Sequence, residues 1–424
     1  MYKEKTYVAK NGIKVYAYPN PALHGFHISL FVRGGSMYET ERESGITHFL
    51  EHATIRNVNK LYGMKLYSLL DKMGLEFNAS TFSEMVQFYV SGSSPSFKAG
   101  AEMISKALMP IELERAELDA ERKRIKAEIR ESDEAGSLTA FSAKQVFCGT
   151  SLAQSIVGTN RAIDSISLKK LASHQKKLLS PNNIFFYVTG AFDESDIEAL
   201  LSFIGSARLE SDTEYKNEAP VPEKFGKRDS SVFVKRDDYT MARFTFDLDM
   251  GKYSVAETDL LYDTLLSGYN SKLFMELSEG RGLVYDVTGG SERYRNIGTL
   301  SFSYEVKSTD LAESIRLVVD ILNSLKREEN IECIKAGYVD NAYMLYDDIR
   351  ELNFTFAYDN HIMEQGYTSV EDRKKRYECI TEKRLAEMAE EIFTPNNVTL
   401  ALKSPNRSLD TEAIREALGK LKAE

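Results

Sequence analysis

The sequence of 424 residues is poor in several residue types and patterns, and each shortage excludes a class of protein. Its three cysteines, Cys148, Cys333 and Cys379, lie far apart, without the spacing of a metal site or a disulfide framework. We therefore expect buried, free thiols and a reducing cytoplasm. Acidic residues outnumber basic ones, and the net charge of −10 disfavours nucleic acid as a partner. No apolar run is long enough to span a membrane, and the first residues lack the apolar core of a signal peptide.

Histidine is also scarce, with six in the chain, yet two of them stand four residues apart. The stretch His48-Phe49-Leu50-Glu51-His52 has the pattern H-x-x-E-H, the inverzincin order. In a helix, both imidazoles project from one face, one turn apart, where they can bind one zinc ion. Glu51 shares that face and can accept a proton from a water at the metal. The alternative is a pair of buried histidines satisfied by hydrogen bonds, and the rarity of the pattern favours zinc.

A zinc site with two histidines needs at least one more protein ligand. Residues 111–132 predict a long, strongly charged helix, in which Glu121 and Glu128 are seven apart and share a face with Ile125. A glutamate from this second helix could complete the site. The spacing does not select Glu128 from the neighbouring carboxylates, and charged helices of this kind usually present a solvated face.

Strand patterns lie on both sides of the zinc-binding motif. Residues 6–33 read as two strands, and residues 77–81 and 86–90 read as a pair. His24 and His27 stand three apart at the start of a strand and therefore face opposite sides, which argues against a ligand role for either.

The second half of the chain repeats part of the first. Ile166-Ser167 matches Ile380-Thr381, and Ser180-Pro181-Asn182-Asn183 matches Thr394-Pro395-Asn396-Asn397, each at an offset of 214 residues. Because this offset is about half the length, it indicates duplicated domains.

We expect an α+β fold of two duplicated domains, each a mainly antiparallel sheet packed against helices. The predicted boundaries are 1–212 for a zinc-binding domain, 213–228 for a linker and 229–424 for a second domain without metal. Only His361 lies in the second half, so that domain cannot repeat the metal site.

Together these motifs resemble the pitrilysin and insulin-degrading enzyme family of zinc metallopeptidases, in a half-size, two-domain form like the subunits of the mitochondrial processing peptidase. The likeness covers nearly the whole chain, and its motifs are Gly35-Ser36 and Glu39 before H-x-x-E-H, Gly74 before Asn78-Ala79-Ser80-Thr81, Glu121-x6-Glu128, and Gly158-Thr159 to Gly190.

The resemblance implies a zinc-dependent endopeptidase that hydrolyses oligopeptides or unfolded polypeptides in an enclosed chamber. It implies one zinc ion per chain, held by His48, His52 and Glu128. Glu51 is then the general base, and Glu121 lies beside the ligands.

The resemblance also assigns residues that bind the substrate. A peptide would add as a strand beside Asn78 and Ala79. Tyr285 of the second domain would donate a hydrogen bond to the oxyanion, aimed by a predicted strand at 283–287.

One position departs from the family. Its second domain carries L-R-x-x-x-G/Q-L-x-Y, but this chain has Ser278 where the arginine belongs. Arg281, one helical turn further on, either replaces that arginine or lies on the surface before a turn.

Two other functions stay open. One is a non-catalytic or partner-dependent chamber subunit of a heterodimeric peptidase: the intact zinc motif weighs against it, and the missing arginine weighs for it. The other is a dedicated maturation protease for one peptide product. We expect a peptide substrate, no membrane or nucleic-acid partner, and a homodimer or a heterodimer with a paralogous subunit.

Overall fold

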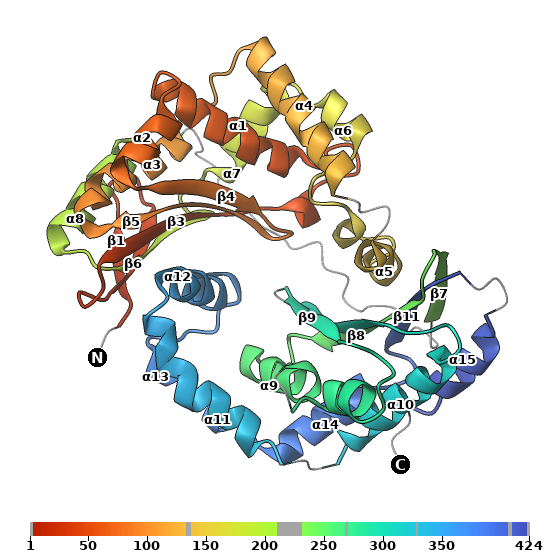
Figure 1. Ribbon diagram of the computed structural model, residues 1–424. Helices are drawn as coiled ribbons and strands as arrows, with labels where there is room; N and C mark the ends of the chain where they lie inside the picture. Colours follow the sequence, from red (N-terminus) through yellow and green to blue (C-terminus); the bar gives the residue numbers. More distant parts are fainter. Residues whose placement is uncertain are drawn as a thin grey trace. The chain divides into compact units, whose positions relative to one another are not determined.

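A computed structural model of the chain describes residues 3–132, 137–209, 231–267, 270–294, 296–327, 330–405 and 409–421. The chain forms two compact units, each built on one β-sheet (Figure 1). The first contains Met1–Asp133, Thr150–Pro220 and Tyr343–Val370, and the second contains Glu134–Gly149, Val221–Ala342 and Glu371–Glu424. The α+β fold is confirmed, and the predicted linker at 213–228 lies outside the described residues.

The first sheet has the strand order β1-β2-β6-β3-β5-β4. Its strands are β1 (Lys5–Val8), β2 (Lys14–Pro19), β3 (Gly25–Arg33), β4 (Glu76–Thr81), β5 (Met85–Ser93) and β6 (Ile184–Gly190). Strands β2 and β6 are parallel, and the other neighbours are antiparallel. The segment 6–33 therefore holds parts of three strands, where the sequence predicts two, because β1 is short and mostly exposed.

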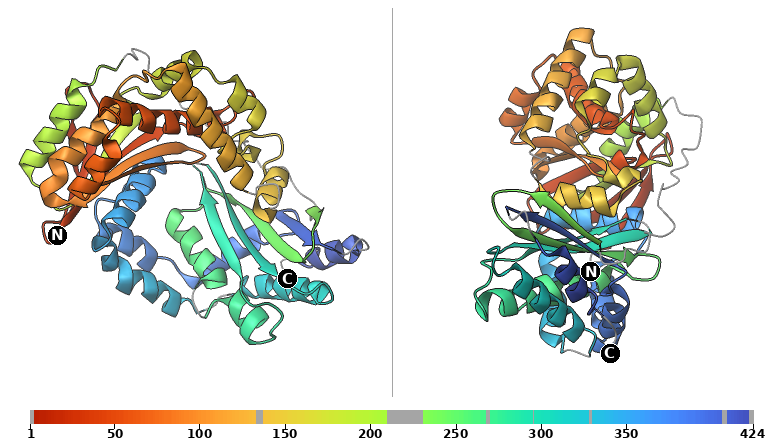
Figure 2. Two further views of the ribbon diagram at one scale, coloured as in Figure 1. Left: turned by 45° about the horizontal axis from the view of Figure 1, so that its top comes forward. Right: turned by 90° about the vertical axis from the view of Figure 1, so that its right-hand side faces the viewer.

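Helices cover both faces of this sheet. One face carries α1 (Ile46–Leu61), α2 (Leu66–Met73), α3 (Phe97–Ser105), α4 (Arg115–Glu131), α6 (Asn160–Ser165), α7 (Leu168–Leu178) and α8 (Glu194–Ser206) (Figure 1). The other face is covered by α12 (Ile349–Ala357), which packs on β3 and β6 and appears in blue beside the red and orange strands in Figure 2. The Asn353 side chain, fully buried, donates to the Tyr187 carbonyl at 2.9 Å. A segment from the second half of the chain thus completes the first unit.

The second sheet has the order β7-β11-β8-β10-β9, with β7 and β11 parallel. Its strands are β7 (Ser231–Arg236), β8 (Met241–Asp249), β9 (Thr288–Arg293), β10 (Ile297–Glu305) and β11 (Val398–Ser404). One face carries α9 (Val255–Leu266), α10 (Leu311–Ser324), α14 (Glu382–Ile392) and α15 (Thr411–Leu418), and α11 (Glu332–Asn341) and α13 (Val370–Glu378) follow α10 in the chain. The other face contacts α5 (Leu138–Val146), which comes from the first half of the chain and packs on β8 and β11.

The repeat found in the sequence is also a repeat of hydrogen bonds. Helix α7 and strand β6 recur as α14 and β11 with the same lengths, each shifted by 214 residues. The Asn183 side chain donates to the carbonyls of Leu178 and Arg33. The Asn397 side chain donates to those of Ile392 and Asp247, the matching positions.

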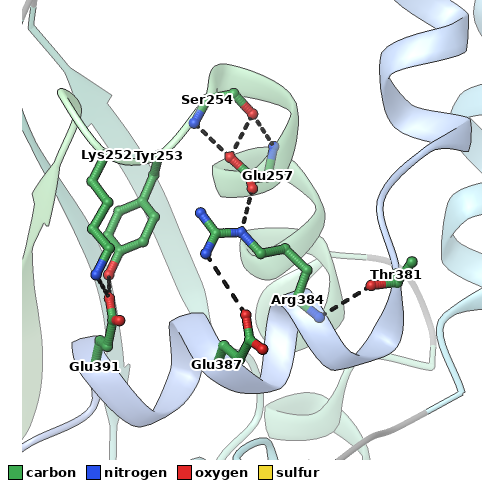
Figure 3. A network of polar contacts seen from close by, with 8 residues as sticks. All are labelled: Lys252, Tyr253, Ser254, Glu257, Thr381, Arg384, Glu387 and Glu391. Atoms are coloured by element: carbon green, nitrogen blue, oxygen red, sulfur yellow. Dashed lines mark hydrogen bonds and ion pairs between the residues drawn. The ribbon is translucent and has the colours of Figure 1, made fainter.

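In the second unit, charged side chains of α14 hold the start of α9 (Figure 3). Ser254 caps α9 in a reciprocal box with Glu257. Arg384 then donates from Nε to Glu257 at 2.5 Å, and Tyr253 donates to Glu391. Helix α9 packs on edge strand β9, as α1 packs on edge strand β4. Helix α9 of the second unit therefore holds the place of α1 at the sheet edge, and it carries no histidine.

The fold bears on two further expectations, which concern the cysteines and membrane-spanning helices. The cysteines are free, as expected, but the prediction that they are buried is wrong, since all three are exposed. Within the described residues, each helix is either too short or too polar to cross a lipid bilayer.

Candidate metal centre

The start of α1 is shaped by two glycines and one buried carboxylate. Gly45 adopts a left-handed conformation, with φ of 86°, and a Cβ there would lie 2.8 Å from the Gly158 Cα. With no side chain of its own to cap the helix, α1 uses Glu39, which accepts the N–H groups of Gly45 at 2.6 Å and Thr47 at 2.8 Å. Of the capping-type residues in the sequence, Ser44-Gly45 and Thr47, Gly45 is the N-cap, but the side chain that accepts the helix N–H groups is that of Glu39. Burial raises the pKa of Glu39.

His48, His52 and Glu128 form a compact group of donor atoms. The His48 and His52 rings lie on one face of α1, with centroids 4.7 Å apart. Glu128 of α4 brings one oxygen to 3.5 Å from His48 Nε2 and the other to 3.4 Å from His52 Nε2. A tetrahedral zinc ion with ligands at about 2.1 Å separates neighbouring ligands by about 3.4 Å. Each of the two Glu128–histidine distances is near that value, though each uses a different carboxylate oxygen. One ligand atom from each of the three residues lies within 4.8 Å of the others, so the group can hold a metal ion.

The protonation of His48 also suits a metal ligand. Burial first, and then the neighbouring His52, lower the pKa of His48 to about 3. The ring is therefore neutral near pH 7, and Nε2 can offer its lone pair. The proton then belongs on Nδ1, which is buried and has no hydrogen-bond partner among the described residues.

Glu121 lies behind His52 and outside the ligand group. Its Oε2 is 3.3 Å from His52 Nδ1, and its Oε1 accepts from Arg56 Nε at 2.5 Å. Burial raises the pKa of Glu121, but the hydrogen bonds from His52 and Arg56 outweigh burial, and the pKa falls below its ordinary value. A carboxylate here can hold a proton of His52 on Nδ1, which would leave Nε2 for a metal. Arg56 was not among the site residues predicted from the sequence, although its position four residues after His52 places it on the same helix face.

Glu51 lies between the two histidines on α1 and is 8 % exposed. Burial raises the pKa of its carboxyl group, while a hydrogen bond from Thr81 opposes that effect. The Thr81 Oγ1 donates to Glu51 Oε2 at 2.5 Å, and Thr81 is the last residue of β4. In the sequence Thr81 belongs to the motif Asn78-Ala79-Ser80-Thr81, which did not predict a contact with Glu51.

Strand β4 also carries the residues predicted to bind the substrate. Ala79 donates its backbone N–H to the side-chain oxygen of Asn78 at 2.9 Å, and Phe82 donates to the Met85 carbonyl across the β4–β5 turn. Because successive N–H groups of a strand point to opposite edges, the Ala79 N–H faces away from β5. Among the described strands, β4 pairs with β5 alone, so this edge is free.

Arg281 and Tyr285 belong to the second unit. Tyr285 is 95 % exposed and lines a pocket of about 660 Å³ within that unit. The predicted strand at 283–287 is wrong, because β9 begins only at Thr288 and the Tyr285 carbonyl accepts from the Ser278 hydroxyl at 3.0 Å. Arg281 is exposed, with Nη1 3.7 Å from a Glu313 oxygen.

Similar sequences include several bacterial proteins of the same size. An uncharacterized zinc protease of Bacillus subtilis, YmxG, is 21 % identical over 96 % of this chain and 99 % of its own. An uncharacterized zinc protease of Rickettsia bellii is 23 % identical over 94 % and 96 %. Subunit 1 of the mitochondrial cytochrome b-c1 complex of Caenorhabditis elegans is 22 % identical over 79 % and 74 %.

Solved structures share the fold over the whole chain. A protease from Helicobacter pylori superposes with a TM-score of 0.83 at 18 % identity, covering 96 % of this chain and 100 % of that one. A chain of complex III2 from Candida albicans has a TM-score of 0.78 at 16 % identity, covering 98 % and 99 %.

Family models describe both halves of the chain. Residues 15–160, which contain His48, His52 and Glu128, match the insulinase model of peptidase family M16. Residues 165–337, which include α9 with no histidine, match the model of the peptidase M16 inactive domain. With the zinc-binding motif in the first model and the duplicated unit in the second, the chain belongs to peptidase family M16, as a half-size, two-domain member.

Proposed function

We propose that this chain is a zinc-dependent endopeptidase that hydrolyses oligopeptides or unfolded polypeptides in an enclosed chamber. The observation that carries the proposal is the group of His48, His52 and Glu128, whose ligand atoms lie within 4.8 Å of one another, with two of them on the helix that also carries Glu51. A buried histidine pair without a metal would not require a third donor at that spacing. The free thiols suit the cytoplasm.

The chain's own residues have separate tasks in this reaction. One zinc ion bound by His48, His52 and Glu128 would act as a Lewis acid and lower the pKa of a bound water. Glu51 accepts the proton of the attacking water and later returns it to the leaving amine. Glu121 and Arg56 keep His52 in the tautomer that offers Nε2.

The substrate is proposed to bind as an added strand on the free edge of β4. The outward Ala79 N–H can donate to a peptide carbonyl once the Asn78 side chain moves away from it. Main-chain hydrogen bonds make few demands on side chains, which suits a broad range of peptides.

Tyr285 is proposed to donate a hydrogen bond to the oxyanion that forms at the scissile carbonyl. Its hydroxyl is free to do so, since the side chain is almost fully exposed. Arg281 is proposed to bind substrate in place of the arginine missing at Ser278.

The test of the proposal is Glu51→Gln, assayed with fluorescence-quenched peptides and by zinc analysis. The amide keeps the shape of the side chain but cannot accept a proton at neutral pH. We expect zinc to be retained and cleavage to be lost, by at least about 10²-fold. Wild-type cleavage by this variant would refute the proposal.

A second candidate is a chamber subunit that depends on a partner or lacks activity. Two observations favour it: the similarity to a cytochrome b-c1 subunit and the serine at position 278. On this proposal the chain pairs with a paralogous subunit, and the purified chain gains peptide cleavage only when that subunit is added.

A further inference from the structure

We propose that Thr81 is a positioning residue for the general base. Its hydroxyl fixes one oxygen of the Glu51 carboxylate, so that the other oxygen stays free to accept a proton. This inference rests on the proposed function, in which Glu51 is the base.

The contact that carries the inference is short and specific. Thr81 Oγ1 lies 2.5 Å from Glu51 Oε2, and among the described residues Glu51 Oε1 has no hydrogen-bond partner. The terminal torsion of a glutamate is broad, so packing alone does not decide which oxygen faces the reacting water. A hydrogen-bond donor on one oxygen fixes the torsion, so that the other oxygen faces the water.

Thr81 is itself held by the sheet. It pairs with Val86 of β5, and it follows Phe77 and Ala79 on the face of β4 that packs against α1. A β-branched side chain on a strand has few χ1 rotamers. The hydroxyl therefore reaches Glu51 from a rigid element, as positioning of a catalytic group requires.

The same strand would also hold the substrate. The Ala79 N–H that faces the free edge lies two residues before Thr81. Because the Thr81 hydroxyl contacts Glu51 and not the peptide-binding edge, its loss should lower kcat far more than it changes KM.

The experiment compares variants that keep or remove the hydroxyl. Thr81→Val preserves shape and branching, Thr81→Ala is a second hydroxyl-free variant in case valine disturbs folding, and Thr81→Ser keeps the donor. Ser80→Ala is the matched control, because Ser80 is the neighbour on the opposite face of β4. We expect kcat to fall about 10–100-fold in the valine and alanine variants, with KM within about threefold. Thr81→Ser and Ser80→Ala should stay within about threefold of wild type.

Two readouts do not depend on turnover by the loaded enzyme. Zinc content should stay at the wild-type value in each Thr81 variant. The affinity of Glu51→Gln for an uncleaved peptide should not change when Thr81→Val is added. A third readout does use turnover: any residual cleavage by Glu51→Gln should not fall further when Thr81→Val is added, since the two groups act as a unit.

Each failure has its own meaning. If Glu51→Gln is inactive while Thr81→Val keeps wild-type kcat, the positioning role is wrong and the proposed function stands. Loss of zinc from Thr81→Val, a change in KM alone, or no recovery in Thr81→Ser would also overturn the positioning role. An active Glu51→Gln would overturn both.

Discussion

Charge is concentrated around the donor atoms of α1. Glu128 contacts both histidines, Glu121 contacts His52, and Glu51 lies on the same helix, while Arg56 is a cation that contacts Glu121. A divalent cation would offset the remaining negative charge, which favours tight binding.

We predict one zinc ion per chain, removed by changing any one ligand. His48→Ala, His52→Ala and Glu128→Ala should each lose zinc, as measured by metal analysis of protein purified without chelator. Glu121→Ala should weaken zinc affinity by about 10–100-fold, because it removes only the support of His52. Glu131→Ala, an exposed glutamate at the end of the same helix, is the control. Full zinc occupancy in Glu128→Ala would refute its assignment as a ligand.

Another histidine of the first unit makes stability depend on pH. His27 is 2 % exposed, and its ring nitrogens lie 2.8 Å from Ser91 Oγ and 3.1 Å from Ser29 Oγ. Burial first, and then the charge of Arg350, lower the pKa of His27 to about 3. An unfolded histidine binds a proton near pH 6.5. The contribution of neutral, folded His27 to the free energy of unfolding is therefore present above pH 6.5 and is lost as the pH falls towards 3.

We predict that His27→Gln reduces this acid sensitivity. Between pH 7 and pH 5, the wild type should lose about 2 kcal/mol more free energy of unfolding than the variant loses. Urea unfolding at the two pH values measures the difference. His24→Gln, which alters an exposed histidine, should follow the wild type. Equal losses in wild type and His27→Gln would show that His27 is protonated in the folded chain.

Among the elements, β4 joins the proposed substrate edge to the base. Ala79→Pro removes an N–H that faces away from β5, so the ladder should survive and peptide binding should weaken. One lost hydrogen bond corresponds to a KM about 2–10-fold higher. Ser80→Pro is the contrast, because the adjacent N–H points to β5 and its loss should lower the melting temperature. Unchanged KM in Ala79→Pro would place the peptide elsewhere.

Local patterns predicted the elements that carry the site, and tertiary contacts decided the rest. The 3.6-residue period places His48 and His52 on α1, and the stripe of Leu118, Glu121, Ile125 and Glu128 follows one face of α4. The cap of α1 could not be read, because Glu39 reaches it through the fold from six residues away. A short apolar run suggested a strand at Tyr285. There the Tyr285 carbonyl accepts from the Ser278 hydroxyl instead of from a neighbouring strand.

At the scale of the whole molecule, the two units share a framework but not the histidine pair. The hydrogen bonds of Asn183 and Asn397 are equivalent, yet the second unit has no histidine in α9. We expect that unit to contact the substrate or another subunit, and Tyr285 and Arg281 are its predicted contacts.

We predict that Tyr285→Phe lowers kcat by about 10²-fold without changing zinc content, as loss of one oxyanion donor does. Arg281→Ala should raise KM if that side chain binds substrate, and a wild-type KM would mark it as a surface residue held near Glu313. If neither change affects cleavage, another polypeptide supplies the second wall of the chamber. Light scattering of the chain alone and with a paralogous subunit would then reveal that complex.

The exchange of helices between the halves affects how the chain is made. The sheet face on β3 and β6 is covered by α12, which is translated about 150 residues after α8. At 5–20 residues per second, a ribosome needs roughly 7–30 s for that stretch. During this interval the nascent first unit holds an incomplete layer, with the apolar side chains under α12 uncovered. A fragment ending at residue 209 would remain in that condition permanently, so the zinc-binding half should be isolated together with residues 343–370 or not at all.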